Sequence, residues 1–600
     1  MSTTLRYWEY YDMQDIFDEL YEESIQGKSL SRLYDIIISE NNILLAYRTI
    51  KSNKGSNTAG TDGFTINDYK TMEKITFIEY VRNKLRNYKP KAVRRVLIPK
   101  PNGDKRPLGI PTMFDRLIQQ MIKQVIEPIC EAKFYKHSYG FRPLRSTQHA
   151  LARAKSLVNR NKLHFTVDID IKGFFDNVNH SLLLKQLWNI GIRDKVLLSI
   201  IYKILKAPIK DIGVPKKGTP QGGILSPLLS NVVLNDLDQW ISGQWENFST
   251  QRTYAYNHSK CNALRDTSTM KEGFIVRYAD DFKVFARTHE TATKWYNAIK
   301  LYLKDRLKLD ISPEKSKIIN LRKRKSDFLG FTIYACKKSN KWVCKSNIRK
   351  KKLLDIKIKA RERIKEIQKS TTAQNILLYN AFVLGIHNYF KYATNVNVNM
   401  NRLAYDLSKT LYNRLKDVAS YEKPNNSPPS FKKFYKNNFR TYKIGSLYLF
   451  PLADIGLSVA KSFVSRKCIY TPEGRELLHQ QLAGQITYEI NKLLTSNIPN
   501  GTMGYLDNRI SRYSMKMGKC EITGVFLHAN EVHCHHYLPK SKGGTDEFKN
   551  LRILSVAVHR LIHASTDKTI NEYLSELSLN TEQINKVNQY RKACNLMEIS

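Results

Sequence analysis

The feature that most limits the fold of this chain is a pair of adjacent acidic residues between two apolar runs. The segment reads GFIVRYADDFKVFA, with Asp280 and Asp281 in its middle. Two apolar runs around a short turn predict a hairpin, and Asp is common in turns. A β-branched run, FTVDID, predicts another strand that ends at Asp170. We therefore expect an α+β domain around an antiparallel sheet, with carboxylates gathered at the strand ends.

Carboxylates so close together at the end of buried strands repel each other unless a cation lies between them. Two Mg²⁺ ions roughly 3.5–4 Å apart can stabilise both oxygens of an in-line phosphoryl displacement. Mg²⁺ prefers oxygen ligands, which explains aspartate at these positions in place of histidine or cysteine. On its own, however, an Asp-Asp turn is more often an ordinary exposed loop tip.

The charge of the chain indicates its partner. The 600 residues hold 98 Lys and Arg against 54 Asp and Glu, a net charge of +44. Such an excess favours binding to a polyanion, and its spread along the chain favours a long nucleic-acid footprint. No apolar run reaches bilayer-spanning length, so a membrane partner is not expected. The polar N-terminus and the cysteines, which form no C-x-x-C pair, predict a reduced, cytoplasmic protein.

Two segments suit a nucleotide. VLIPKPNGDKRPLGIP places Lys100 and Arg106 around an Asn-Gly turn, where a triphosphate could bind, although a solvated charge run is the commoner explanation. KGTPQGGILSPLL contains Gly218, Gly222 and Gly223, which permit close backbone approach to a nucleotide.

The C-terminal region carries a second chemistry, built from histidines. His559 and His563 are four residues apart, so a helix presents both on one face. His535 and His536 are adjacent on a predicted strand and point to opposite sides, so only one can join that pair as a metal ligand. The other can act as a general base at neutral pH. Asn550, after the Gly-Gly return, is a candidate to orient the backbone or an imidazole.

The motifs RPLGIP, YGFRP, DIDIKGFFDNVNH, GTPQGGILSPLLSN, RYADDF, LDISPEKSKI and FLGF follow one another over about residues 90–335. In this order they resemble the reverse transcriptases encoded by group II introns. The resemblance implies that Asp170 and Asp280, with Asp281 beside them, hold two Mg²⁺ ions. Asp168 falls outside the family's metal position, which implies a structural role or a place directly behind the metal ligands.

The same resemblance implies the nucleotide contacts. Phe175 corresponds to the aromatic gate against a ribose 2′-OH, and Gln221 to the residue that packs on the incoming dNTP. Lys100 and Arg106 correspond to the triphosphate contacts. Lys315 is a looser match to the residue that protonates departing pyrophosphate.

Residues 345–420 have a basic helical pattern without strand signals, and LYNAFVLGIHNYFKYATN resembles the thumb, or maturase, region of the same family. That region grips intron RNA. Phe382 and Phe390 are expected in the helix core. The candidates for contact with single-stranded RNA are Tyr379, His387, Asn388 and Lys391.

The histidine region, HCHHYLPKSKGGTDEFKNLRILSVAVHRLIH, resembles an HNH endonuclease. The resemblance implies that His535, His559 and His563 hold one divalent metal, Mg²⁺ or similar. His536 is then the base and Asn550 its orienting residue. The cysteines that often form a zinc knuckle around this site are not in place, so a structural zinc is not expected.

The resemblances imply a multidomain α+β protein: a right-hand polymerase with an antiparallel palm sheet, an α-helical thumb and a small ββα-metal module. The expected function is intron mobility, with RNA-directed DNA polymerase, splicing and target-nicking activities. Partners are intron RNA, target DNA and dNTPs, and a homodimer is left open. The alternatives are a standalone reverse transcriptase with a host role such as defence, and a splicing-only RNA-binding maturase. The expected domains are an N-terminal helical extension (1–70), fingers and palm (71–335), thumb (336–440), a DNA-binding region (441–515) and the nuclease (516–600).

Overall fold

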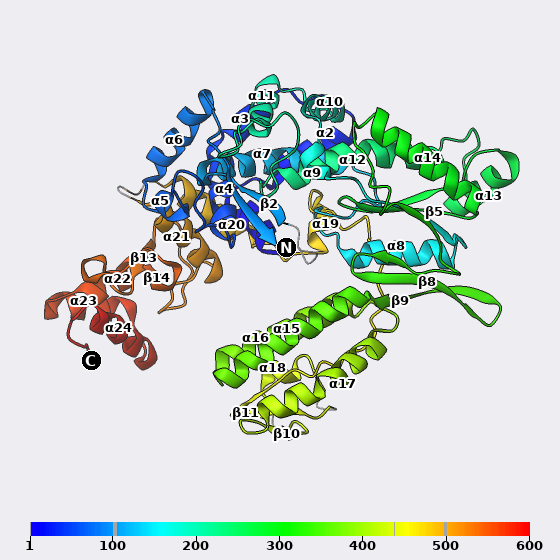
Figure 1. The fold of residues 1–600 in the computed structure, drawn as a ribbon. Helices are drawn as coiled ribbons and strands as arrows, with labels where there is room; N and C mark the ends of the chain where they lie inside the picture. Colours follow the sequence, from blue (N-terminus) through cyan, green and yellow to red (C-terminus); the bar gives the residue numbers. More distant parts are fainter. Residues whose placement is uncertain (1, 100–104, 426, 437–438, 497, 499–500) are drawn as a thin grey trace. The chain divides into compact units, whose positions relative to one another are not determined.

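The computed structural model describes residues 2–99, 105–425, 427–436, 439–496, 498 and 501–600 (Figure 1). The chain divides into two compact units, and each is built from segments that are far apart in the sequence. The first unit comprises Met1–Phe134, Phe175–Val232 and Ser465–Ser600, and the second Tyr135–Phe174 and Val233–Val464.

The first unit is mainly helical and is built around α7 (Met113–Lys133), which is buried along most of its length. Thr112 caps this helix by accepting a hydrogen bond from the Asp115 backbone N–H. Buried polar side chains of other helices bind its backbone, as where the Ser24 hydroxyl donates to the Ile129 carbonyl at 2.9 Å. The other helices of this part are α1 (Ser2–Tyr10), α2 (Gln14–Ile25), α3 (Leu33–Ile37), α4 (Glu40–Lys51), α5 (Ile66–Lys70), α6 (Lys74–Arg86), α9 (Phe174–Asn177), α10 (His180–Ile190), α11 (Lys195–Leu205) and the beginning of α12 (Ser226–Gly243), whose residues from Val233 onward belong to the second unit.

Two hairpins complete the first unit. Strands β1 (Arg94–Pro99) and β2 (Lys105–Ile110) pair antiparallel around the predicted Asn-Gly turn, which lies outside the described residues. Strands β13 (Val532–His536) and β14 (Leu551–Ser555) also pair antiparallel, and a helix follows directly. The C-terminal elements are α19 (Pro472–Glu476), α20 (Gly484–Thr495), α21 (Met503–Met515), α22 (Val556–His563), α23 (Asp567–Leu577) and α24 (Thr581–Ala593), with short 3-10 turns at Lys540–Lys542 and Phe548–Asn550.

The second unit contains the predicted antiparallel sheet, in the strand order β4-β5-β3-β6. Its strands are β3 (Phe165–Ile169), β4 (Phe274–Tyr278), β5 (Asp281–Ala286) and β6 (Lys317–Asn320). The hairpin predicted around Asp280 and Asp281 is confirmed as β4 and β5. The helices α8 (Thr147–Asn159) and α14 (His289–Asp305) pack against this sheet, and α13 (Asn257–Thr267) belongs to the same unit.

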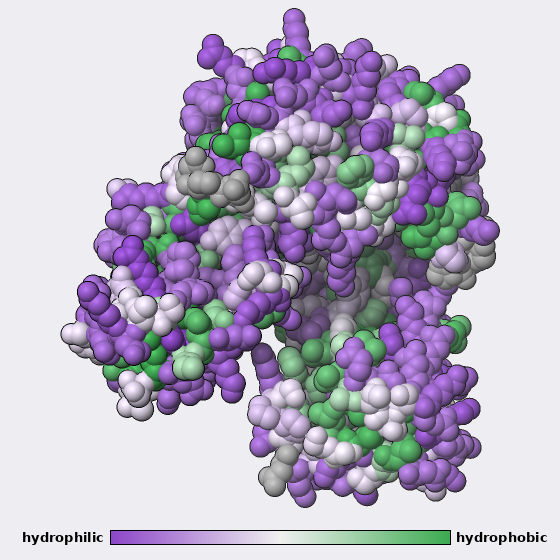
Figure 2. Space-filling model, turned by 90° about the vertical axis from the view of Figure 1, so that its left-hand side faces the viewer, coloured by the Kyte–Doolittle hydropathy of each residue, from purple (hydrophilic) through white to green (hydrophobic). Residues whose placement is uncertain are grey.

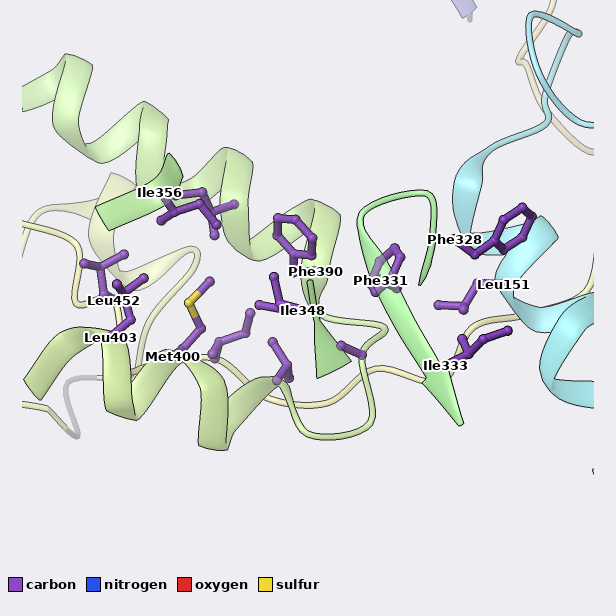
Figure 3. Close-up of a cluster of buried hydrophobic side chains, with 14 of the residues drawn as sticks. Leu151, Phe328, Phe331, Ile333, Ile348, Ile356, Phe390, Met400, Leu403 and Leu452 are labelled. Carbon is purple, nitrogen blue, oxygen red and sulfur yellow. The ribbon is translucent and has the colours of Figure 1, made fainter. Parts of the chain in front are cut away.

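A continuous hydrophobic core runs from this sheet into the helical part of the second unit. Figure 3 shows Phe328, Phe331 and Ile333 beside Leu151 at one end, and Met400, Leu403, Leu452 and Ile356 at the other. The helical part consists of α15 (Lys350–Lys369), α16 (Ala373–Phe390), α17 (Val396–Leu415) and α18 (Pro429–Lys432). Phe390 is buried and Phe382 packs against this core, as predicted.

The sequence prediction missed two small sheets at the borders of the helical region. Strands β7 (Ser326–Phe328), β8 (Phe331–Lys338) and β9 (Lys341–Ile348) form one sheet, and β9 extends into the segment expected to lack strands. The other consists of β10 (Ser420–Glu422), β11 (Thr441–Ile444) and β12 (Leu447–Tyr448). Charged residues in β9 hide its strand character, because Lys341 and Lys345 interrupt the apolar pattern.

The surface is polar, as the net charge predicts. In the face shown in Figure 2 hydrophilic residues predominate and hydrophobic ones form separate patches. In the part of the chain that the structure describes, no helix combines the length and hydrophobicity that a bilayer crossing requires.

Candidate catalytic sites

The three candidate carboxylates meet at one end of the β4-β5-β3-β6 sheet. Strand β3 pairs with β5 in a register that joins Asp168 to Lys283 and Ile169 to Phe282. Continued by one residue, this register brings Asp170 beside Asp281, at the turn that connects β4 and β5. Asp170 is half-buried, whereas Asp280 and Asp281 are exposed to solvent. The structure thus brings together all three predicted ligands.

The electrostatics of this end of the sheet favour a bound cation. Desolvation by the surrounding protein and the neighbouring carboxylates of Asp168 and Asp280 together raise the pKa of Asp281 to about 6, against the opposing charge of Lys283. A divalent cation bound by these oxygens would relieve the repulsion. The donor set, which consists only of carboxylate oxygens, fits Mg²⁺.

Asp168 has a different partner, although it shares a strand face with Asp170. Its carboxylate accepts from the Lys283 ammonium at 2.7 Å and from the Ser326 hydroxyl at 2.8 Å. Lys283 is buried and also donates to Ser326. Asp168 therefore belongs to a partly buried ion pair beside the candidate ligands, which agrees with the structural role expected for it.

The turn that carries the acids has an unusual backbone, held by two neighbours. Ala279 has φ +56°, in the left-handed region that side chains rarely adopt. The Arg277 guanidinium donates to the Ala279 carbonyl at 2.9 Å and forms a fully buried ion pair with Asp238. On the other side lies Gly140, where a Cβ atom would come 2.3 Å from the Ala279 nitrogen. No pattern in the sequence indicated a role for Arg277, Asp238 or Gly140.

Replacing Gly140 by alanine is expected to reduce nucleotide incorporation at the acidic site by about 100-fold, because shifts of ~1 Å near reacting groups cost that much. The new methyl group would meet backbone atoms of Tyr278 and Ala279, which cannot rotate away. Steady-state primer extension measures the effect. The matched control is Gly243→Ala at the end of α12, where an added Cβ meets nothing within 4 Å. Equal activities of the two variants would show that the backbone turn at Ala279 does not depend on glycine at position 140.

Replacing Arg277 by methionine is expected to lower the free energy of unfolding by about 3–5 kcal/mol, because it leaves Asp238 as an unpaired buried charge. Urea unfolding of the purified variant measures this loss. The control is Lys294→Met, which breaks an exposed ion pair with Glu290 on α14 and should leave the free energy of unfolding nearly unchanged. A loss below 1 kcal/mol in the Arg277 variant would contradict the expected role.

A loop after α14 flanks Asp170. The Ser312 backbone N–H donates to the Asp170 carbonyl at 2.8 Å, and the Ser316 hydroxyl accepts from the Asp170 N–H at 3.1 Å. The Lys315 ammonium lies 3.6 Å from the Asp170 carboxylate, and both side chains reach solvent. Lys315 is therefore close to the acidic site, although its part in proton transfer stays a prediction.

The nucleotide candidates Phe175 and Gln221 lie in the first unit. The Phe175 carbonyl accepts from the Thr219 N–H at 2.7 Å, and the Gln221 carbonyl accepts from the Gly109 N–H at 2.5 Å. These bonds hold the segment around Gln221 between α9 and β2. Gly222 has φ +113°, and a Cβ there would lie 2.3 Å from the Gly109 carbonyl oxygen, so glycine is required.

A cavity of about 220 Å³ adjoins this segment and is lined in part by Gln221, Arg95 and Lys217. Arg106 lies on β2 opposite Ile98, where only its backbone is described. Lys100 lies outside the described residues. The contacts of both with a triphosphate therefore stay predictions.

The RNA-contact candidates in and directly after α16 divide into two groups, and this corrects part of the prediction. Tyr379 and His387 are buried. His387 is held by the Leu452 carbonyl at 3.1 Å and the Tyr435 hydroxyl at 3.0 Å, so both of its ring nitrogens have partners within the protein. Tyr379 and His387 are therefore core residues in this structure and present no surface to RNA. Asn388 is exposed and Lys391 is half-buried, which leaves these two as candidates.

The same unit has a basic pocket that the sequence analysis did not single out. It has a volume of about 630 Å³ and lies where α15 begins, beside α17. Its cationic side chains are Lys325, Arg349, Lys350, Lys351, Lys357 and Arg402. The cluster K-S-N-I-R-K-K-K in the sequence was the available signal, since basic runs near a helix start suit phosphate groups.

In the C-terminal region the predicted strand and helix bring four histidines together. His533 and His535 alternate on β13, while His559 and His563 lie one turn apart on α22. The His535 ring centroid is 5.3 Å from that of His559 and 5.2 Å from that of His563. His559 stacks on His533 at 3.5 Å, a neighbour that the prediction did not include.

Burial, together with the neighbouring imidazoles, lowers the pKa of His535 and His559 to about 3 and that of His533 to about 4. All three rings are therefore neutral near pH 7. Neutral imidazoles in a partly buried cluster are suitable ligands for a divalent metal ion.

His536 points away from this cluster, as predicted. Its Nε2–H donates to the Asp546 carboxylate at 2.8 Å, and its ring stacks on Tyr505. Burial would raise the pKa of Asp546, but hydrogen bonds from His536, Lys540 and Thr502 outweigh it, and the pKa is lowered. Asp546 is thus an orienting residue that the sequence analysis missed, although it lies in the quoted motif.

The side chain of Asn550 forms its hydrogen bonds with backbone groups and not with the His536 imidazole. Its side-chain amide donates to the carbonyls of Leu538 and Thr545, and its side-chain oxygen accepts from the Leu538 N–H at 2.8 Å. These bonds fasten the loop between β13 and β14. Of the two roles considered for Asn550, the structure therefore shows backbone orientation.

Comparison with known proteins adds to this geometry. The family model described as reverse transcriptase (RNA-dependent DNA polymerase) matches residues 98–333. The chain is 30% identical over 460 residues to the group II intron-encoded protein LtrA of Lactococcus lactis subsp. cremoris, a match that covers 66% of this chain and 75% of that protein. It is 33% identical over 307 residues to protein YkfC of Escherichia coli strain K12, covering 48% of this chain and 79% of that protein. A shorter match, 28% identical over 184 residues, joins 23% of this chain to 24% of nuclear intron maturase 2, mitochondrial, of Arabidopsis thaliana.

Proposed function

Because this chain belongs to the group II intron-encoded proteins, we propose that it copies its intron RNA into DNA from a primer that its own C-terminal nuclease cuts. The family and the match over residues 98–333 show that the chain is a reverse transcriptase and an intron maturase. The proposal adds the residues that perform each step, the nuclease activity and the DNA target.

The observation that carries the polymerase site is the strand register that brings Asp170 beside the Asp280–Asp281 turn. We propose that these three carboxylates bind two Mg²⁺ ions. Magnesium, when bound there, supplies positive charge for in-line attack of a primer 3′-hydroxyl on the α-phosphate of a dNTP. Asp170 and Asp280 are the principal ligands, and Asp281 is beside them. Lys315, 3.6 Å from Asp170, would donate a proton to the departing pyrophosphate.

The nucleotide itself would be bound by residues of the first unit. Phe175 would exclude a ribose 2′-hydroxyl, and Gln221 would pack on the base and sugar. Lys100 and Arg106 would bind the triphosphate. These four assignments rest on their matches to the family motifs. For Phe175 and Gln221, backbone hydrogen bonds from Thr219 and Gly109 also hold the segments that carry them.

For the C-terminal region we propose an HNH endonuclease. The ββα arrangement of β13, β14 and α22 supports it, as does the hydrogen bond from His536 Nε2–H to Asp546. That bond leaves Nδ1 of His536 as the atom that can take a proton from water. A metal ion held by the cluster that includes His535 and His563 would stabilise the departing 3′-oxygen of the cut strand. The resulting 3′-hydroxyl is the primer for the polymerase.

Intron RNA is the proposed partner of the basic helical region. The pocket lined by Lys350, Lys351 and Arg402, together with exposed Asn388, could bind phosphate groups and unpaired bases. Binding energy directed at the folded RNA would assist splicing, while the RNA performs its own chemistry.

The test uses the full chain purified with the RNA that accompanies it. Sequencing of that RNA should return one intron, and this result would exclude a standalone reverse transcriptase. The complex should nick one strand of a DNA duplex that contains the intron's insertion site and should join labelled dNTPs covalently to the nicked strand. Extension of an added primer without any labelling of the duplex would leave a reverse transcriptase but refute the nuclease. RNA binding without extension would indicate a splicing-only maturase.

A further inference from the structure

The end of α24 adds a donor to the histidine cluster that the HNH motif does not contain. Ligand atoms of His535, His563 and Cys594 all lie within 4.8 Å of one another. The His535 Nδ1 atom is 3.4 Å from His563 Nε2. Cys594 is the residue directly after α24, about 30 residues beyond the motif, so no motif pattern includes it.

The position of Cys594 is fixed by buried contacts. Arg591, on the last turn of α24, is 2% exposed, and its guanidinium donates to the carbonyls of Leu561, Ile562 and Ala564 at the end of α22. This cation at a helix C-terminus locks α24 onto α22. The Cys594 N–H donates to the Tyr590 and Arg591 carbonyls, which holds the thiol at the end of its helix.

The cluster also contains a buried polar atom without a partner. His535 is 3% exposed, and its Nε2 atom has no hydrogen-bond partner among the described residues. A buried imidazole nitrogen that lacks a partner is costly unless a ligand satisfies it. His559, the third ligand expected from the motif, instead stacks on His533.

We propose that His535, His563 and Cys594 form a thiolate-containing site for a zinc-like transition metal ion. Two imidazoles and one thiolate make a soft donor set, which favours Zn²⁺, Co²⁺ or Cd²⁺ over Mg²⁺. Three protein ligands leave the fourth tetrahedral position open, as in catalytic zinc sites. This inference rests on the proposed nuclease, because it names the class of metal ion that the nuclease site binds.

Cobalt binding tests this assignment directly, without measuring catalysis. Added to the full chain freed of metal, Co²⁺ should produce a thiolate-to-cobalt charge-transfer band in the near ultraviolet. Cys594→Ser should remove this band and weaken Co²⁺ binding by more than ~10-fold. Loss of a residue that only supports a metal ligand already lowers metal affinity by about 10-fold, and loss of a ligand should lower it more. The matched control is Cys468→Ser, a partly buried thiol outside the cluster, which should keep the band.

Two further measurements distinguish a loss of metal binding from a folding defect. Zn²⁺ should raise the melting temperature of the unchanged protein and of Cys468→Ser but not that of Cys594→Ser, whose metal-free melting temperature should be unaltered. His559→Ala should keep the charge-transfer band. A band that persists in Cys594→Ser, or that is absent from the unchanged protein, would overturn the assignment.

Nicking of target DNA is measured separately on the same samples. An unchanged protein that nicks DNA but forms no cobalt–thiolate band would refute the inference and leave the nuclease intact. A protein that forms the band but does not nick would refute the nuclease while the metal site stands.

Discussion

Replacing both Asp280 and Asp281 by asparagine should reduce primer extension on an RNA template by at least ~1000-fold, equivalent to about 4 kcal/mol of transition-state stabilisation. The change removes two of the three carboxylates that converge at the end of β3. Asparagine keeps the size of each side chain but lacks the negative charge that holds magnesium. Incorporation of labelled dNTPs over a range of Mg²⁺ concentrations is the measurement.

The control for this variant is Asp305→Asn, which removes an exposed acid of the same unit at the end of α14. It should extend primers at the normal rate. The acidic pair is exposed, so the double variant should fold normally and should still bind intron RNA. Primer extension within tenfold of the unchanged protein would show that the turn is an ordinary loop tip.

Replacing His536 by alanine should reduce DNA nicking by ~100-fold or more, the usual contribution of a general base. The imidazole that Asp546 orients would be lost. The cluster of His535, His559 and His563, which lies on the other side of β13, would remain. Conversion of labelled duplex to its nicked form is the measurement. Primer extension from an added oligonucleotide should be unchanged, because the acidic site uses none of these residues.

His528→Gln is the control for the nuclease variant. This histidine lies just before β13 and contacts Glu489, and glutamine can still donate a hydrogen bond there. It should nick normally. The variant that lacks Asp280 and Asp281 should also nick, which separates the two activities. If His536→Ala nicks at the normal rate, His536 is not the base.

Several site features followed from local sequence pattern alone. A β-branched run predicted β3, two apolar runs predicted the β4–β5 hairpin, and the four-residue spacing of His559 and His563 predicted α22. These features depend on neighbours within a few residues, and side-chain periodicity is set by the backbone itself. Pattern failed where charge interrupted it, as in β9, whose lysines hid a strand.

The burial of α16 shows the limit of such patterns. Apolar residues lie around much of this helix, so periodicity did not reveal which polar aromatic residues face inward. Tyr379 and His387 were expected at the RNA surface but lie in the core. The partners of His387 are Tyr435 and Leu452, which follow it by 48 and 65 residues. No local spacing indicates such contacts.

The sequence by itself determined that Asp170, Asp280 and Asp281 lie at strand ends and that His535 and His536 face opposite ways. Only the tertiary structure decided what surrounds them. It pairs Asp168 with Lys283, sets Gly140 against Ala279, and brings Asp546 to His536 and Cys594 to His535. These contacts join separate elements, and packing of the whole fold selects them, whereas the strands and helices that carry the ligands follow from near neighbours.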